Sequence, residues 1–289
     1  MAIQACHNEQ GYPIEAACAL LHAARSAYHK WASGKLSRRA AENERLADKI
    51  EKIHGESPDK GYRRLNDDLR HDYGIHVNDK RVLRICRAKD IKSTIKYTSH
   101  GCTRQAENPQ YLAENLLNRQ FHASQTNQKW LTDVTEFKWY KGLEVHKVYL
   151  SAILDLYDRR IVAFEISERN DNPLVFKTFD EAVEACPNAH PLFHSDRGYQ
   201  YTNRAFHHKL EKAGLTQSMS RVAHCIDNGP MEGFWGILKR ERYYGRRFTS
   251  KQELAQMIER YIRYYNTRRV QRNLGVLTPM EKHELCLAA

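Results

Sequence analysis

An aspartate in the middle of an apolar strand is the feature that most limits what this chain can fold into. The segment Trp130–Phe137 is rich in β-branched and aromatic residues, which favour a strand, and Asp133 stands near its middle. A carboxylate buried there without a partner would be strongly destabilising. The fold must therefore supply a partner for Asp133.

More strands and a helix follow this first strand. We predict strands at 146–156 and 160–167, a helix opened by Asn172-Pro173, and a short buried strand at 191–194. Helices are expected after it, most clearly at 231–244 and 254–265. Three sequential strands, then a helix and another strand, predict a mixed α/β sheet.

The part of the chain before this sheet is predicted to be helical. Residues 13–24 and 26–33 suggest two short helices, with Ser26 as the cap of the second; they have helix-turn-helix proportions, although an ordinary helical hairpin explains them more simply. A second helical unit begins near Ala41, and Gly74 ends one of its helices. Asn78 is expected to cap the next helix.

These patterns divide the chain into five expected segments. They are an N-terminal helical segment (1–50), a basic helix-turn-helix-like region (51–100), a linker with one helix at Tyr111–Arg119 (101–125), a catalytic core (126–245) and a basic helical C-terminal segment (246–289).

The charge balance points to a polyanionic partner. The chain has 46 Lys+Arg against 35 Asp+Glu, so its net charge is 46 − 35 = +11. Cations dominate residues 80–96, where only Asp90 opposes them; they are Lys80, Arg81, Arg84, Arg87, Lys89, Lys92 and Lys96. A charged helix is commonly just a solvated face, but this one-sided sign favours contact with a DNA backbone or groove.

Other classes of protein are disfavoured. The longest apolar stretch is interrupted by Ser151 and Asp155 and is far shorter than a membrane span of roughly 20 residues. The seven cysteines are scattered and include no Cys-x-x-Cys pair, which favours reduced thiols over disulfides or a zinc site. With no export signal at the N-terminus, we expect a cytoplasmic protein, and its basic charge favours association with DNA.

Three acidic residues form the candidate catalytic constellation. Asp196 follows the predicted strand at 191–194, and Glu232 lies in the first turn of a predicted helix. Between Asp133 and Asp196 lie 62 residues, and between Asp196 and Glu232 lie 35. Three carboxylates in one site repel one another unless cations separate them, and Mg²⁺ or Mn²⁺ prefers such oxygen ligands. Two such ions about 3.5–4 Å apart would support phosphoryl transfer on a nucleic-acid backbone.

The sequence around these acids resembles a known family. Trp130–Thr135, His194–Tyr201 and Asp227–Trp235 resemble the three acidic motifs of the DDE transposase and retroviral integrase superfamily. Further family-like segments are Gly61–Leu65, Leu238–Glu241 and Tyr264–Pro279. The chain is identified as a member of the IS-three family of bacterial insertion-sequence transposases, as its second reading-frame product.

The resemblance implies a fold and a reaction. The fold is a ribonuclease-H-like core with Asp133 on its first strand, Asp196 after its fourth, and Glu232 on a helix across the sheet. The reaction is metal-dependent nicking at an element end, followed by attack of the freed 3′ hydroxyl on another phosphodiester without a covalent enzyme intermediate. In this family the first joining usually links the two ends of one element.

The resemblance also implies partners. Besides the element ends and the target DNA, these are further copies of the chain on DNA and a smaller upstream reading-frame product that is commonly fused to it by frameshifting. Because the chain starts at Met1 and has no heptad zipper, we expect it to be only the catalytic part.

Basic residues beyond Glu232 are candidate DNA contacts. Lys239 is seven residues further on, almost two helical turns, so it shares a helix face with Glu232. The family assigns a basic residue at this spacing to the DNA terminus; without the resemblance Lys239 would be a plain surface lysine. Phosphate contacts that weaken steeply with salt are expected from the C-terminal arginines, namely Arg246, Arg247, Arg260, Arg263, Arg268, Arg269 and Arg272.

Several neighbouring residues have simpler explanations. Asn228 is expected to cap the helix of Glu232 rather than reach the metals. Asp155 and Asp158 belong to a turn between strands, and His194 is expected to be buried with its hydrogen bonds satisfied. Packing is also the expected role of two indoles, Trp130 and Trp235.

Two other functions compete with transposition. A related nuclease such as ribonuclease H would hydrolyse DNA or RNA without joining it, but it does not need the basic helical units at both ends of this chain. A repressor that has lost catalysis would bind DNA only, but the three acids argue against it. A strand-transfer assay separates the three, because only a transposase yields joined product.

Overall fold

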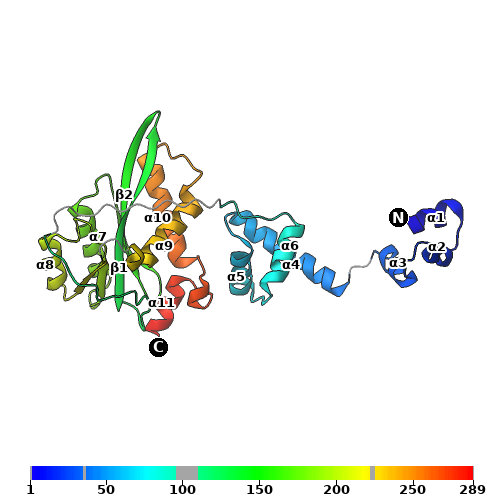
Figure 1. Cartoon of the computed structure of the whole chain (residues 1–289), viewed down its shortest axis with the longest axis horizontal. Coiled ribbons are helices and arrows are strands. Elements are labelled where there is room, and N and C mark those ends of the chain that lie inside the picture. The colour runs from blue at the N-terminus through cyan, green and yellow to red at the C-terminus, as the bar shows by residue number, and fades with distance from the viewer. Residues whose placement is uncertain (1, 35–36, 96–109, 222–224, 289) are drawn as a thin grey trace.

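The structure is a computed structural model that describes residues 2–34, 37–95, 110–221 and 225–288. Figure 1 shows an elongated molecule with a sheet-containing domain at one end, a three-helix unit beside it, and three short helices at the far end. Within the described residues no helix is long and apolar enough to cross a membrane.

The short N-terminal helices lie apart from the rest of the chain (Figure 1). They are α1 (Ala2–Gln10), α2 (Ile14–Leu20) and α3 (Arg25–Ala32). The two helices predicted here are confirmed as α2 and α3, and α1 was not predicted. Ser26 does not cap α3, because the helix begins one residue earlier, after Ala24, and has no side-chain cap.

The next unit packs three helices around its own core. They are α4 (Arg38–Glu56), α5 (Tyr62–Tyr73) and α6 (Asp79–Ala88). The end signals are confirmed: Gly74 has a positive φ of 63°, and the Asn78 side chain accepts a hydrogen bond from the Lys80 amide. Apolar side chains of all three helices, such as Ile50, Leu65 and Val82, are fully buried together. Helix α4 runs unbroken across residue 50, so this unit starts before the boundary expected there.

A five-stranded mixed sheet forms the centre of the larger domain, and the predicted fold class is confirmed. The strands are β1 (Lys129–Lys141), β2 (Glu144–Asp155), β3 (Ile161–Ser167), β4 (Leu192–Ser195) and β5 (Thr216–Met219). Their order is β3-β2-β1-β4-β5. The pairs β1/β2 and β2/β3 are antiparallel, whereas β1/β4 and β4/β5 are parallel.

Helices cover both faces of this sheet. On one face lie α7 (Asn172–Ala185) and α8 (Arg204–Lys212), and on the other α9 (Gly229–Leu238) and α10 (Lys251–Thr267). Because side chains alternate along a strand, Trp130 packs with α7 and Leu131 packs with α9 and α10. Trp130 and Trp235 both lie in these cores, as predicted.

The helix predicted at Tyr111–Arg119 is wrong. This stretch runs without helical structure along β5, where the Tyr111 amide donates to the Thr202 carbonyl and the Met219 amide donates to the Glu114 carbonyl. The Ser218 hydroxyl accepts hydrogen bonds from two further amides, those of Leu116 and Leu117. Bonds to distant residues thus replace the local bonds of a helix.

The C-terminal part begins with a change of helical pitch. Residues Lys239–Tyr243 (η2) continue α9 as a π-helical turn, so the predicted helix at 231–244 is present but changes type. After α10 come η3 (Arg272–Leu274) and α11 (Pro279–Leu287), whose start is fixed by a capping box of Thr278 and Glu281.

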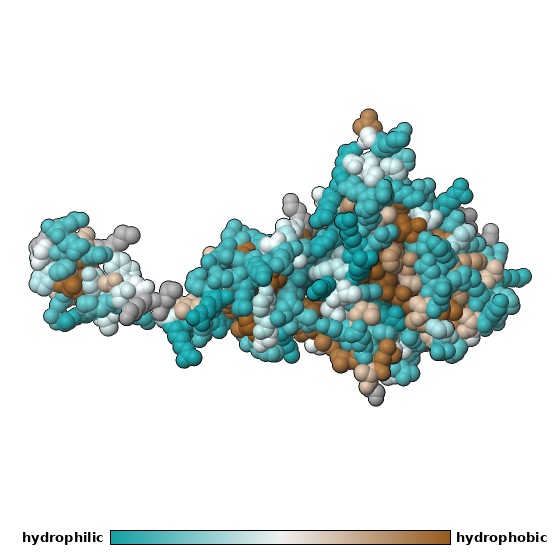
Figure 2. All heavy atoms as spheres, turned by 180° about the vertical axis from the view of Figure 1, so that it is seen from behind, coloured by the Kyte–Doolittle hydropathy of each residue, from teal (hydrophilic) through white to brown (hydrophobic). Residues whose placement is uncertain are grey.

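The β1–β2 hairpin projects from the body of the domain (Figure 1). Its turn lies at Gly142, where φ is 62°. Leu143 at the tip is 98% exposed, and Figure 2 shows apolar atoms at the apex of this projection above hydrophilic sides. The hairpin therefore holds its apolar tip away from both cores.

Candidate active site

Two of the three candidate acids are brought together by strand register. In the parallel pair β1/β4, Leu131 lies opposite His194. Asp133 is two residues beyond Leu131, and Asp196 is two residues beyond His194. Asp133 therefore lies just past the part of β1 that pairs with β4, and Asp196 lies just past the carboxyl end of β4. Ligands gather at the carboxyl ends of parallel strands in sheets of this kind.

The pKa values of all three acids are raised, and two of them respond to the charges of the others. Burial, reinforced by the charges of Asp196 and Glu232, raises the pKa of Asp133 to about 8. Burial raises the pKa of Asp196 as well. For Glu232, in the first turn of α9, burial and the Asp196 charge raise the pKa. Such mutual repulsion marks a site that favours a cation.

Protein donors occupy several of the carboxylate oxygens. The Asp133 Oδ1 atom accepts the Val134 amide at 2.8 Å, and Oδ2 accepts the Trp235 Nε1–H group at 3.0 Å. Asp196 Oδ1 accepts the Gly198 amide at 2.9 Å. In the described part of the chain no three His, Cys, Asp or Glu side chains are arranged to hold a metal ion. Glu232 is the exposed member of the three acids.

Gly198 gives the Asp196 carboxylate its space. A Cβ atom on Gly198 would stand 3.0 Å from Asp196 Oδ1 and 3.1 Å from the Gln200 Oε1 atom. Contacts this close require the neighbouring atoms to shift. Glycine therefore allows the backbone amide to approach the carboxylate directly.

Asn228 does not cap α9, so that prediction is wrong. Its Nδ2 group instead donates to the Thr132 carbonyl at 3.1 Å, and no side-chain bond closes the start of the helix. The Oδ1 atom is buried and has no hydrogen-bond partner among the described residues. Asn228 therefore ties the start of the helix that carries Glu232 to the strand position just before Asp133.

Lys239 lies near the strand that carries Asp133. Lys239 is the first residue of η2, and its Nζ atom is 5.1 Å from the centre of the Phe137 ring. Burial lowers the pKa of Lys239, while the charges of Glu136 and Asp133 oppose this effect. The ammonium group is half-buried beside the acidic edge rather than fully solvated.

The polar residues expected to be structural are structural. Asp155 accepts the backbone amides of Asn127 and Tyr157, and Asp158 binds Arg160. The remaining prediction concerns His194, whose ring nitrogens bond to two serine hydroxyls, those of Ser218 at 2.8 Å and Ser220 at 3.1 Å. Burial lowers the pKa of His194 to about 4, so this ring is neutral and satisfied.

The candidate DNA-contacting arginines fall into two groups. The exposed residues are Arg84, Arg87, Arg246, Arg247, Arg260, Arg263 and Arg268, and Arg247 also donates to the Gly142 carbonyl at 2.7 Å. Arg81 is half-buried and bonds to Asn43, and Lys96 lies outside the described residues. Arg269 is turned inward and pairs with Glu241 at 2.8 Å, and Arg272 pairs with Asp67 at 2.6 Å. These last two guanidinium groups are engaged within the protein.

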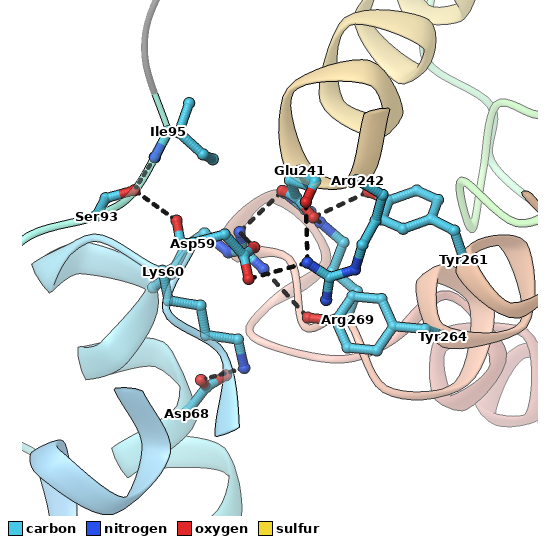
Figure 3. Close-up of polar contacts among 11 residues, drawn as sticks. Asp59, Lys60, Asp68, Ser93, Ile95, Glu241, Arg242, Tyr261, Tyr264 and Arg269 are labelled. Atoms are coloured by element: carbon cyan, nitrogen blue, oxygen red, sulfur yellow. Dashed lines mark hydrogen bonds and ion pairs between the residues drawn. The ribbon is translucent and has the colours of Figure 1, made fainter. Parts of the chain in front are cut away.

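Sequence reasoning missed the role of Glu241. Its carboxylate is 3% exposed and binds Arg64 of α5 at 2.8 Å. It also binds Arg269 at 2.8 Å (Figure 3). Beside it, Arg242 pairs with Asp59 at 3.1 Å. We call these five residues the junction cluster. The partners of Glu241 are distant in the sequence, so its role was not predictable from its neighbours. The sequence shows only an acid at the end of the segment Leu238–Glu241.

Comparison with known proteins shows which family this chain is similar to. Two family models described as an integrase core domain match residues 123–225 and 232–284, and one described as an HTH-like domain matches 41–98. The putative transposase InsK of insertion sequence element IS150 from Escherichia coli strain K12 is 35% identical over 94% of this chain and 94% of its own. The chain belongs to the IS-three family of insertion-sequence transposases.

Other relatives of this transposase carry similar names. Transposase InsF of IS3A from Escherichia coli strain K12 is 28% identical and covers 94% of each chain. Among solved structures, the HTLV-2 integrase catalytic core in complex with magnesium covers 55% of this chain and 98% of its own, with 16% identity and a TM-score of 0.42. The family acts in DNA transposition and integration, and its superfamily consists of polynucleotidyl transferases.

Proposed function

We propose that this transposase cleaves the ends of an insertion sequence and joins the freed 3′ hydroxyl to a second phosphodiester, with Asp133, Asp196 and Glu232 as the catalytic carboxylates. The observation that carries the proposal is the register of β1 and β4, because Asp133 and Asp196 each follow the last paired residues, Leu131 and His194, by two positions. The raised pKa of Glu232, caused by burial and by the Asp196 charge, supports its membership of the same site.

The donor set fits divalent metal ions. Carboxylate oxygens are the ligands that Mg²⁺ and Mn²⁺ prefer, and a cation relieves the repulsion that raises the pKa of Asp133. We infer two ions per site, held by the three acids. Once bound, the ions would supply Lewis-acid activation of the attacking oxygen and stabilisation of the leaving oxygen.

The chain's own residues would orient the reaction. The Val134 amide and the Trp235 indole fix the Asp133 carboxylate, and the Gly198 amide fixes that of Asp196. Lys239, beside Asp133, would hold the DNA terminus against the acids. Contacts to the DNA phosphates are proposed for the exposed arginines Arg84, Arg87, Arg246, Arg247 and Arg268, and for the half-buried Arg81.

Two features of the assembly are also proposals. Joining two element ends requires the ends to be held together, which favours several copies of the chain on DNA. The upstream reading-frame product would contribute end recognition as a frameshifted fusion.

A strand-transfer assay on labelled element ends tests the function. The wild-type chain is expected to yield joined product with Mg²⁺, whereas Asp133→Asn is expected to abolish cleavage and joining and to leave DNA affinity largely intact. Asp48→Asn, an exposed aspartate on α4, serves as the matched control. Cleavage without joining by the wild-type chain would support a nuclease, and binding alone would support a repressor. Full joining by Asp133→Asn would overturn the site assignment.

A further inference from the structure

Trp235 links the helix of Glu232 to the strand of Asp133. It is three residues after Glu232, about one helical turn, so the two side chains leave neighbouring positions on α9. The indole is only 6% exposed. Its Nε1–H group donates to Asp133 Oδ2 at 3.0 Å, across 102 residues of sequence.

This hydrogen bond completes the fixation of the Asp133 carboxylate. Oδ1 already accepts the amide of Val134 on the same strand, β1. Each oxygen of the carboxylate therefore has one donor, Oδ1 from β1 and Oδ2 from α9. A carboxylate offers about four acceptor positions, and two of them remain open for cations. An indole N–H is a donor only and does not titrate near neutral pH, so its role is the same across the working range.

We propose that Trp235 is a positioning residue that sets the orientation of Asp133 for metal binding and couples that carboxylate to the helix carrying Glu232. The inference rests on the proposed function, since it assumes that Asp133 is a metal ligand. Partners that orient a ligand typically change metal affinity by about 10- to 100-fold when they are removed. Trp235→Phe is expected to weaken metal binding by this amount.

Packing and hydrogen bonding can be separated at this position. The ring of Trp235 packs on Phe234 with ring centres 5.1 Å apart, and phenylalanine keeps an aromatic ring while removing the N–H group. Trp139→Phe is the matched control, because its Nε1 atom is also buried but has no partner among the described residues. Trp139 stacks on His146 in the hairpin, with ring centres 4.3 Å apart.

The experiment measures Mn²⁺ and Mg²⁺ binding to the full chain without DNA, by calorimetry, for the wild type and three variants. Trp235→Phe is expected to bind about 10- to 100-fold more weakly, Trp139→Phe like the wild type, and Asp133→Asn far more weakly than either. Wild-type affinity in Trp235→Phe overturns the inference and leaves the proposed function intact. Wild-type affinity in Asp133→Asn overturns the proposed function itself.

A second measurement uses only the wild-type chain, so it does not depend on whether a variant folds. In the ¹H–¹⁵N spectrum of the wild-type chain, assigned through side-chain connectivities, the Trp235 indole resonance is expected to move as Mg²⁺ is added. The Trp139 resonance is expected to stay in place. An indole resonance of Trp235 that remains fixed while the metal saturates the site would contradict the inference.

Discussion

Replacing Glu241 by glutamine tests the energetics of the junction cluster. The substitution keeps the length of the side chain but removes the charge that faces Arg64 and Arg269. The Glu241 and Arg269 side chains are 3% and 12% exposed, so the guanidinium group of Arg269 is left largely buried without a counter-charge. Breaking a buried pair in this way costs about 3–5 kcal/mol, against about 0–1 kcal/mol for a pair in solvent.

The assay measures the thermal unfolding of the full chain by differential scanning calorimetry. For a unit of this size roughly 1 kcal/mol shifts the melting temperature by about 2–4 °C, so we expect a fall of about 6–20 °C in the transition that contains α10. Glu259→Gln, an exposed acid on α10, is the matched control and should shift it by less than about 2 °C. A similarly small shift for Glu241→Gln would refute the reasoning.

Three further predictions concern the acidic site. Because the pKa of Asp133 is raised to about 8, the metal-free folded chain holds a proton that the unfolded chain releases near pH 4. The free energy of unfolding should therefore fall as the pH rises from about 4 to 8. In EDTA, Asp133→Asn should make the melting temperature less dependent on pH over this range. Gly198→Ala should lower metal affinity, measured by calorimetry, because its Cβ atom crowds Asp196 Oδ1; unchanged affinity would contradict this account. Lys239→Ala should weaken binding of labelled element ends more than metal binding, and the reverse order would argue against its DNA role.

Local signals were enough to predict much of the fold. The Gly74 and Asn78 helix ends act through their own backbone neighbours, and the β-branched run around Asp133 predicted β1. The stretch at Tyr111–Arg119 failed for the opposite reason. Its backbone groups bond to residues about a hundred positions away, which no window of local propensity can include.

The candidate site shows the same division. Residue type and order were enough to select Asp133, Asp196 and Glu232, because acids in an apolar strand, at a strand end and at a helix start need a chemical reason. The Trp235 bond to Asp133 was not predictable, since packing alone explains a tryptophan in an apolar helix. The inward turn of Arg269 also depends on a distant partner, Glu241, and nothing in the basic run around it distinguishes this arginine from its neighbours.

The way in which the three-helix unit attaches to the rest of the chain has a mechanical consequence. In the described residues the apolar core of α4, α5 and α6 includes no side chain from the integrase-like part, and polar links such as Arg64–Glu241 and Arg272–Asp67 cross the border. Separating the two parts would leave both apolar cores covered, but it would break the buried Arg64–Glu241 pair; dissolved ions weaken only the links that face solvent. The attachment of the two parts therefore depends on charge rather than on a shared apolar core.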